Sequence, residues 1–124
     1  MVVCLNMTRF YIQHMAMILK LSIAGDDLSI DVPDSVLTEG EEFFAHMDCD
    51  MDRGWQMGRQ YVDNPSMTQR CQIAADRLLT ALSHDNQSTK LLMAGYILSR
   101  MPTIDRVVID HTGNMQDTEF EFHP

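Results

Sequence analysis

The chain has few basic residues and no long apolar run. Nine Lys and Arg stand against 18 Asp and Glu, which gives a formal net charge of −9 at pH 7. Such a surface repels phosphate groups, so we expect no binding to nucleic acid or to anionic lipid. No apolar stretch approaches the roughly 20 residues that a membrane-spanning helix needs. The sequence therefore predicts neither a nucleic-acid-binding nor a membrane protein.

Paired cysteines and glycine-rich loops are also missing. The three cysteines, Cys4, Cys49 and Cys71, contain no CxxC pair. This pattern excludes a disulfide framework or a zinc ribbon, and it is typical of reduced thiols in the cytoplasm. The six glycines stand alone, without a phosphate-binding loop, and no common catalytic motif occurs. We therefore assign no catalytic or cofactor-binding residue, and an enzyme is not the class that we favour.

The composition is that of one globular domain. The chain has 124 residues, of which 45% are hydrophobic and 22% charged, enough for a core of its own. We expect a single domain over residues 17–124. Residues 1–16, MVVCLNMTRFYIQHMA, lack the basic start and cleavage site of a secretory signal. We expect them to be a disordered extension or a misassigned start, because Met7, Met15 and Met17 are also in frame.

Alternating hydrophobicity at both ends of the domain predicts two β-hairpins. Residues 18–32 place every second apolar side chain on one face, and Gly25 stands in the tight connection between the two halves. Near the C-terminus a β-branched run at 107–109 is followed by turn residues at 111–114 and by alternation over 115–122.

Three helices are predicted between the hairpins. The first begins near a capping box at residues 38–41, although Asp34 or Ser35 could cap an earlier start, and this helix runs to about Val62. The second is capped by Asn64 and carries an apolar stripe as far as Leu82, before a break at 83–86, and the third covers roughly 87–101. Gly58 and Gly95 fall within these helical patterns, and Gly95 indicates a close helix crossing. The predicted fold is α+β, in the order ββαααββ, with both hairpins in one antiparallel sheet packed against the three helices.

The acidic segment HMDCDMDRGWQMGR, residues 46–59, is the strongest candidate for a functional site. Asp48, Asp50 and Asp52 match the first ligand positions of an EF-hand calcium loop. That loop also needs glycine at its sixth position and glutamate at its twelfth, where this sequence has Arg53 and Arg59. The EF-hand is therefore excluded.

A helical interpretation suits the segment better. Apolar residues at helical spacing continue through it as one stripe, formed by Phe44, Met47, Met51, Trp55, Gly58 and Val62. The acidic residues then flank the stripe, and they predict a solvated, salt-bridged side of an amphipathic helix. Met51 and Trp55 are expected in the core. Met57 and Tyr61 lie off the stripe, so we expect them to be exposed and to form a surface for a partner.

One flank of this helix also carries possible metal ligands. Glu42, His46 and Cys49 follow each other at spacings of four and three, so neighbouring side chains can meet. Carboxylate, imidazole and thiolate all bind transition-metal ions, although a further donor from elsewhere in the chain would be needed.

These observations favour a small acidic cytoplasmic protein that is not an enzyme. We expect an interaction or accessory protein that binds a protein partner or a second copy of itself, as in a homodimer. The alternative is a protein that binds or senses a transition-metal ion through Glu42, His46 and Cys49.

Overall fold

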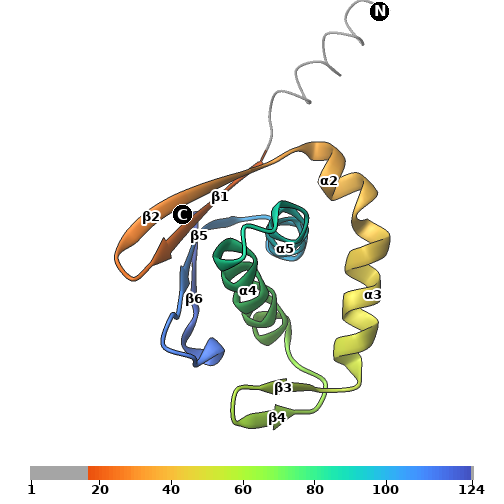
Figure 1. Ribbon diagram of the computed structural model, residues 1–124. Coiled ribbons are helices and arrows are strands. Elements are labelled where there is room, and N and C mark those ends of the chain that lie inside the picture. The colour runs from red at the N-terminus through yellow and green to blue at the C-terminus, as the bar shows by residue number, and fades with distance from the viewer. Residues whose placement is uncertain (1–16, 124) are drawn as a thin grey trace, which may run out of the picture.

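The computed structural model describes residues 17–123 and has an α+β architecture (Figure 1). Strands β1 (Met17–Ile23) and β2 (Asp26–Val32) form the predicted first hairpin, in which Met17 lies opposite Val32. Ala24 and Gly25 make the turn with φ angles of 54° and 86°. This hairpin is confirmed. Residues 1–16, which we expected to be an extension or a misassigned start, lie outside the described residues.

The first predicted helix is wrong in length. In its place the chain forms α2 (Asp34–Glu39), α3 (Glu41–Asp52) and a small hairpin of β3 (Trp55–Met57) and β4 (Gln60–Val62). Helix α3 ends because Gly54 follows it with a φ of 106°, a left-handed conformation that terminates helices. The Tyr61 side chain fills the space that a Cβ on Gly54 would need. Gly58 lies in the hairpin turn with a φ of 64°, not in a helix.

The next two helices lie where the sequence places them, with one change in capping. Helix α4 (Met67–Ser83) begins after Ser66, not after Asn64. The Ser66 hydroxyl accepts a hydrogen bond from the backbone N–H of Gln69 (3.2 Å), and the Gln69 side chain accepts one from the Ser66 N–H (2.8 Å). This reciprocal pair satisfies two N–H groups of the first turn. Helix α5 (Gln87–Arg100) is capped by Asn86.

The sheet contains both hairpins, but it is mixed and not antiparallel. Strand β5 (Ile104–Ile109), the 3₁₀ turn η1 (Met115–Asp117) and strand β6 (Glu119–Phe122) form the second hairpin. The strand order is β2-β1-β5-β6, and β1 pairs with β5 in parallel. The antiparallel prediction is wrong at this junction because the helices carry the chain back to the end of the sheet from which β1 starts. Such a crossover is what parallel pairing requires.

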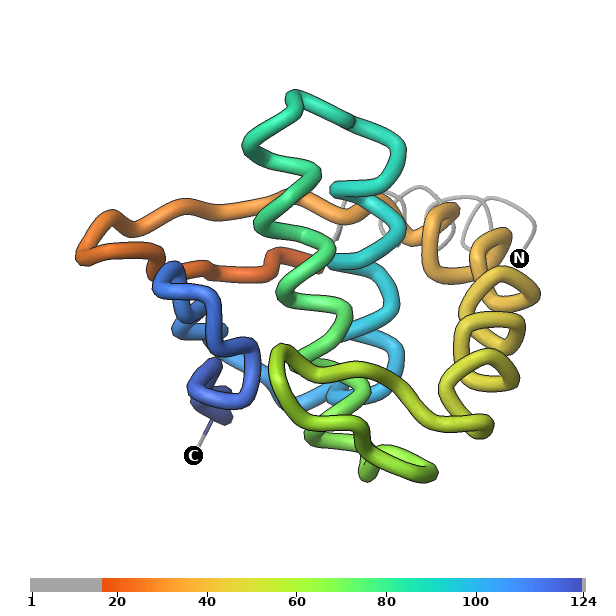
Figure 2. Tube along the Cα trace, turned by 60° about the horizontal axis from the view of Figure 1, so that its bottom comes forward, coloured from red at the N-terminus to blue at the C-terminus, as the bar shows by residue number. Residues whose placement is uncertain are grey.

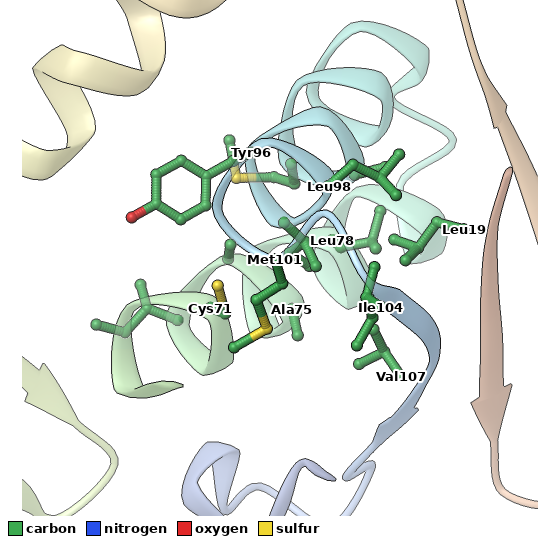
Figure 3. Close-up of a cluster of buried hydrophobic side chains, with 14 of the residues drawn as sticks. Leu19, Cys71, Ala75, Leu78, Tyr96, Leu98, Met101, Ile104 and Val107 are labelled. Atoms are coloured by element: carbon green, nitrogen blue, oxygen red, sulfur yellow. The ribbon is translucent and has the colours of Figure 1, made fainter. Parts of the chain in front are cut away.

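The elements are stacked in layers. Helices α4 and α5 pack on one face of the sheet, and α2 and α3 lie on their far side (Figures 1 and 2). Side chains of β1 and β5 meet those of α4 and α5 in the core, which includes Leu19, Leu78, Leu98 and Val107 (Figure 3). Because α5 has the sheet on one side and α3 on the other, every residue from Met93 to Leu98 is buried.

Candidate functional site

Asp48, in the acidic segment, points from α3 toward α5. Its Oδ1 accepts a hydrogen bond of 2.6 Å from the Tyr96 hydroxyl. Its Oδ2 accepts bonds from Nη2 and Nε of Arg100, at 2.8 and 3.1 Å. In Figure 3 the Tyr96 ring extends away from Leu19 and Val107, on the side opposite the sheet. The carboxylate therefore joins the outer helix layer to the central one.

Arg70 of α4 makes the second connection to α3. Its Nη2 donates to Asp52 (2.6 Å) and to the Asn64 side chain (3.0 Å), and its Nε donates to the Pro65 carbonyl (2.9 Å). Its Nη1 approaches Oδ1 of Asp48 at 3.4 Å. The residue is only 8% exposed, so a guanidinium at this position needs these acceptors.

Arg100 also interacts with residues other than Asp48. Its Nη1 donates to Glu41 at 3.2 Å, so the guanidinium joins two residues of α3. It also lies over the rings of Tyr96 and Phe44, at 5.1 and 5.9 Å from their centroids, which adds cation–π attraction. We call Glu41, Asp48, Asp52, Arg70, Tyr96 and Arg100 the charged cluster.

The cluster is arranged to hold its charges, not to exchange protons near neutral pH. Burial favours a higher pKa for Asp48, but hydrogen bonds from Tyr96 and Arg100 outweigh it and lower the pKa. Burial and the bond to Asp48 raise the pKa of Tyr96. Burial also raises the pKa of the neighbouring Cys71 thiol to about 12. A general acid or base works best with a pKa near the working pH, and these three groups do not have one.

The predicted metal-ligating residues lie on the other flank of α3. Glu42, His46 and Cys49 are all exposed there. Among residues 17–123, no three or more His, Cys, Asp or Glu side chains come together in a way that could hold a metal ion. The structure thus brings no further donor to these three residues, and the metal site stays a prediction.

The β3–β4 hairpin places the two residues of the predicted partner surface, Met57 and Tyr61, in different environments. Met57 is 2% exposed, so the expectation that it is exposed is wrong, because β3 turns this side chain into the core. Tyr61 is 57% exposed, and its hydroxyl donates to the Arg53 carbonyl at 2.8 Å. Met51 is buried as predicted, whereas Trp55 is half-buried.

An apolar groove lies between the α2–α3 elbow and the first half of α5. It has a volume of about 330 Å³, with Glu39 and Ser88 among its lining residues. The remaining lining residues are Val36, Gly40, Phe43, Leu91 and Leu92. Phe43 is 39% exposed, which is high for so large an apolar side chain. We call this feature the elbow groove.

Two glycines allow the elbow groove to form. A Cβ on Gly95 would lie 3.0 Å from Cζ of Phe44 and 3.2 Å from Cγ1 of Val36. A Cβ on Gly40 would lie 2.5 Å from the Val36 carbonyl oxygen. Glycine at 95 therefore lets α2 and α3 approach α5, as the sequence indicated, although the groups that meet α5 there are side chains and not backbone.

A larger, polar cleft lies elsewhere. It measures about 500 Å³ and separates the β3–β4 turn from the loop around residues 112–116. Gln116 donates to Gln60 across it at 3.2 Å, and Arg59 is the one charged residue among those that line it. Amides and a single guanidinium supply neither a nucleophile nor a base. We therefore regard the elbow groove as the better candidate site.

The sequence did not reveal Arg70 and Arg100 as partners of the acidic segment. A usable signal was present, because Arg70 lies beside the apolar stripe of its helix, where an arginine needs a carboxylate.

Comparison with protein-family models, with curated proteins and with solved structures finds no match to this chain. Among the described residues, no helix is both long and apolar enough to span a membrane.

Proposed function

We propose that the protein is a small cytoplasmic interaction or accessory protein that is not an enzyme. It binds an apolar, positively charged segment of a protein partner in the elbow groove. The observation that carries this proposal is the groove itself, in which Phe43, Leu91 and Leu92 offer apolar surface to solvent. Exposed apolar concavities of this kind are typical of sites for partner segments.

The charge of the protein supports a basic partner. The net charge is −9, and Glu39 lines the groove while Glu42 lies exposed on the adjoining helix α3. Complementary charge accelerates association and selects against acidic partners. A second copy of the chain carries the same negative charge, so charge favours a different protein over a homodimer.

The charged cluster supports a binding role in a second way. It holds α3 against α4 and α5 through Asp48, Arg70 and Arg100. Helix α3 supplies Phe43 to one wall of the groove, and α5 supplies Leu91 and Leu92 to the other. A wall fixed in this way is preorganised, which lowers the entropy lost on binding.

The test is photo-crosslinking in the native host. A benzoyl-phenylalanine at position 43 should form an adduct with one protein, whereas the same group at the exposed position Tyr61 should not. The captured protein is then purified, and its Kd is measured with the wild-type chain, with L91D and with Y61D. We expect L91D to weaken binding at least tenfold and Y61D to leave it unchanged. Adducts from position 61 alone, or equal Kd values, would contradict the proposal, and a 43–43 adduct would identify a homodimer instead.

A further inference from the structure

We infer that residues 1–16 of the same chain dock in the elbow groove and compete there with a partner. The inference rests on the proposed function only in using the same groove. Its test needs no partner, so either idea can fail without the other.

The first support is the place where the segment joins the fold. Met17 pairs with Val32, at the end of β1 that lies beside the entry to α2 (Figure 1). The Val36 N–H donates to the Pro33 carbonyl at 3.0 Å, and Val36 lines the groove. Met17, to which residues 1–16 are joined, therefore lies on the side of the fold where the chain enters α2 and the groove. Even as a helix these sixteen residues would span about 24 Å, and an extended chain would reach about 53 Å.

The second support is chemistry. Eleven of these sixteen residues are apolar, including Phe10, Tyr11 and Ile12, which suits an apolar groove. The segment contains Arg9 and no Asp or Glu, so all 18 acidic residues of the chain lie after it. Its charge is thus opposite to that of the rest of the molecule and to that of Glu39 in the groove lining. These are the properties that we expect of a partner segment.

The third support is the tether. A short flexible connection holds a segment near its site at an effective concentration of about 1 mM. Even an intrinsic Kd of about 0.1 mM would then leave roughly nine-tenths of the grooves filled. A partner must displace the segment before it can bind. The partner's apparent affinity is therefore its affinity for the open groove multiplied by the fraction of grooves that are free.

Trypsin provides a direct test, because Arg9 is the only tryptic site before Lys20. In the full chain, we expect cleavage after Arg9 to be about tenfold slower than in F43D, in which a hydrated carboxylate replaces the apolar ring that lines the groove. E39K should also accelerate cleavage, since it repels Arg9. D50K is its matched control: it makes the same change in charge at an exposed residue of α3 that does not line the groove, and it should leave the rate unchanged.

The melting temperature and the cleavage rate at Lys20 show whether a variant has unfolded. A variant that unfolds accelerates both cleavages, whereas loss of docking accelerates only cleavage after Arg9. Equal Arg9 rates in the wild-type, F43D and E39K proteins would overturn the inference. Protection that grows with protein concentration, together with a dimer in native mass spectrometry, would also overturn it, because the segment would then occupy a second copy.

Discussion

At the scale of single residues, Asp48 determines how α3 is attached. It accepts hydrogen bonds from Tyr96 and Arg100 and lies within 3.4 Å of Arg70. Its side chain keeps 26% of its exposure, so the interactions are partly screened by water. The neighbouring Asp50 is exposed and provides a comparison on the same helix.

Replacing Asp48 by Asn should destabilise the fold. The change removes the negative charge between Arg70 and Arg100, and it replaces one of the two acceptor oxygens by an NH2 group that cannot accept their N–H bonds. Breaking a fully buried pair costs about 3–5 kcal/mol, and partial exposure reduces the expected loss to about 2 kcal/mol. Urea denaturation at pH 7 measures it. D50N should stay within about 0.5 kcal/mol of wild type, and an equal effect of the two substitutions would show that Asp48 is not the attachment point.

The contribution of Asp48 should depend on pH in a defined direction. Its pKa is lower in the folded protein than the ordinary value of 3.8, so the ionised form stabilises the fold. This stabilisation is fully present above about pH 5, and it is lost as the pH falls from about 4 toward the lowered pKa. The difference in unfolding free energy between wild type and D48N should therefore be constant from pH 5 to 8 and shrink below about pH 4. A difference that persists unchanged in acid would contradict this assignment.

The two described cysteines should differ sharply in reactivity. Cys49 is exposed on α3, whereas burial raises the pKa of Cys71 to about 12. A thiol alkylates as its thiolate, so iodoacetamide at pH 8 should modify Cys49 in the native protein and leave Cys71 intact. Peptide mass mapping distinguishes the two sites. Labelling of Cys71 at the same rate without denaturant would show that the core at α4 opens readily.

The sequence predicted only part of this residue-level arrangement. Helical spacing places Glu41, Asp48 and Asp52 on one side of the first predicted helix, and the structure gives all three arginine partners. The arginines come from helices that follow much later in the chain. Which arginine meets which carboxylate depends on how α4 and α5 pack, and no local pattern contains that information.

At the scale of elements, glycine decides where helices end and meet. The apolar stripe continues past Asp52, yet α3 ends there because Gly54 adopts a φ of 106°. The β3–β4 hairpin follows, and Trp55, Gly58 and Val62 in it fit the helical period closely enough to conceal the change, whereas Met57 does not fit that period. A glycine just after a helical run is itself an end signal, and it was outweighed by the periodicity.

Gly95 should be sensitive to substitution because of the ring that packs on it. Alanine gains up to about 1 kcal/mol in helix propensity. That gain is outweighed by overpacking of about 1–3 kcal/mol, since Phe44 is fully buried and lies 3.0 Å from the new Cβ. We therefore expect G95A to be less stable than wild type in thermal or urea unfolding.

A double-mutant cycle tests the cause of this loss. In the F44L background the ring is absent, so the cost of G95A should fall or reverse in sign. The same cost in both backgrounds would mean that Phe44 does not restrict this position.

At the scale of the whole molecule, the alternation of strands and helices predicted an α+β protein with a hairpin at each end, and both hairpins are present. Which strands meet in the middle of the sheet depends on the path of the chain through the helices. The parallel pairing of β1 with β5 follows from that path, which the pattern of each strand does not encode.

The layered arrangement also leaves the elbow groove open. Helices α4 and α5 are covered on both sides, by the sheet and by α2 with α3 (Figure 1). Where α2 meets α3 the cover is incomplete, and Phe43, Leu91 and Leu92 line the remaining concavity. The proposed function therefore concerns an apolar face where the central layer stays accessible to a partner segment.

Native mass spectrometry of the protein purified from its own host, without added metal or chelator, tests the central claim most directly. We predict a complex of the metal-free chain with one protein partner in fixed ratio, which is lost in F43D and kept in Y61D. A chain that carries one metal ion per subunit and no partner, and that loses the ion when His46 is replaced by Ala, would contradict the account. The functional centre would then be the Glu42, His46 and Cys49 flank of α3.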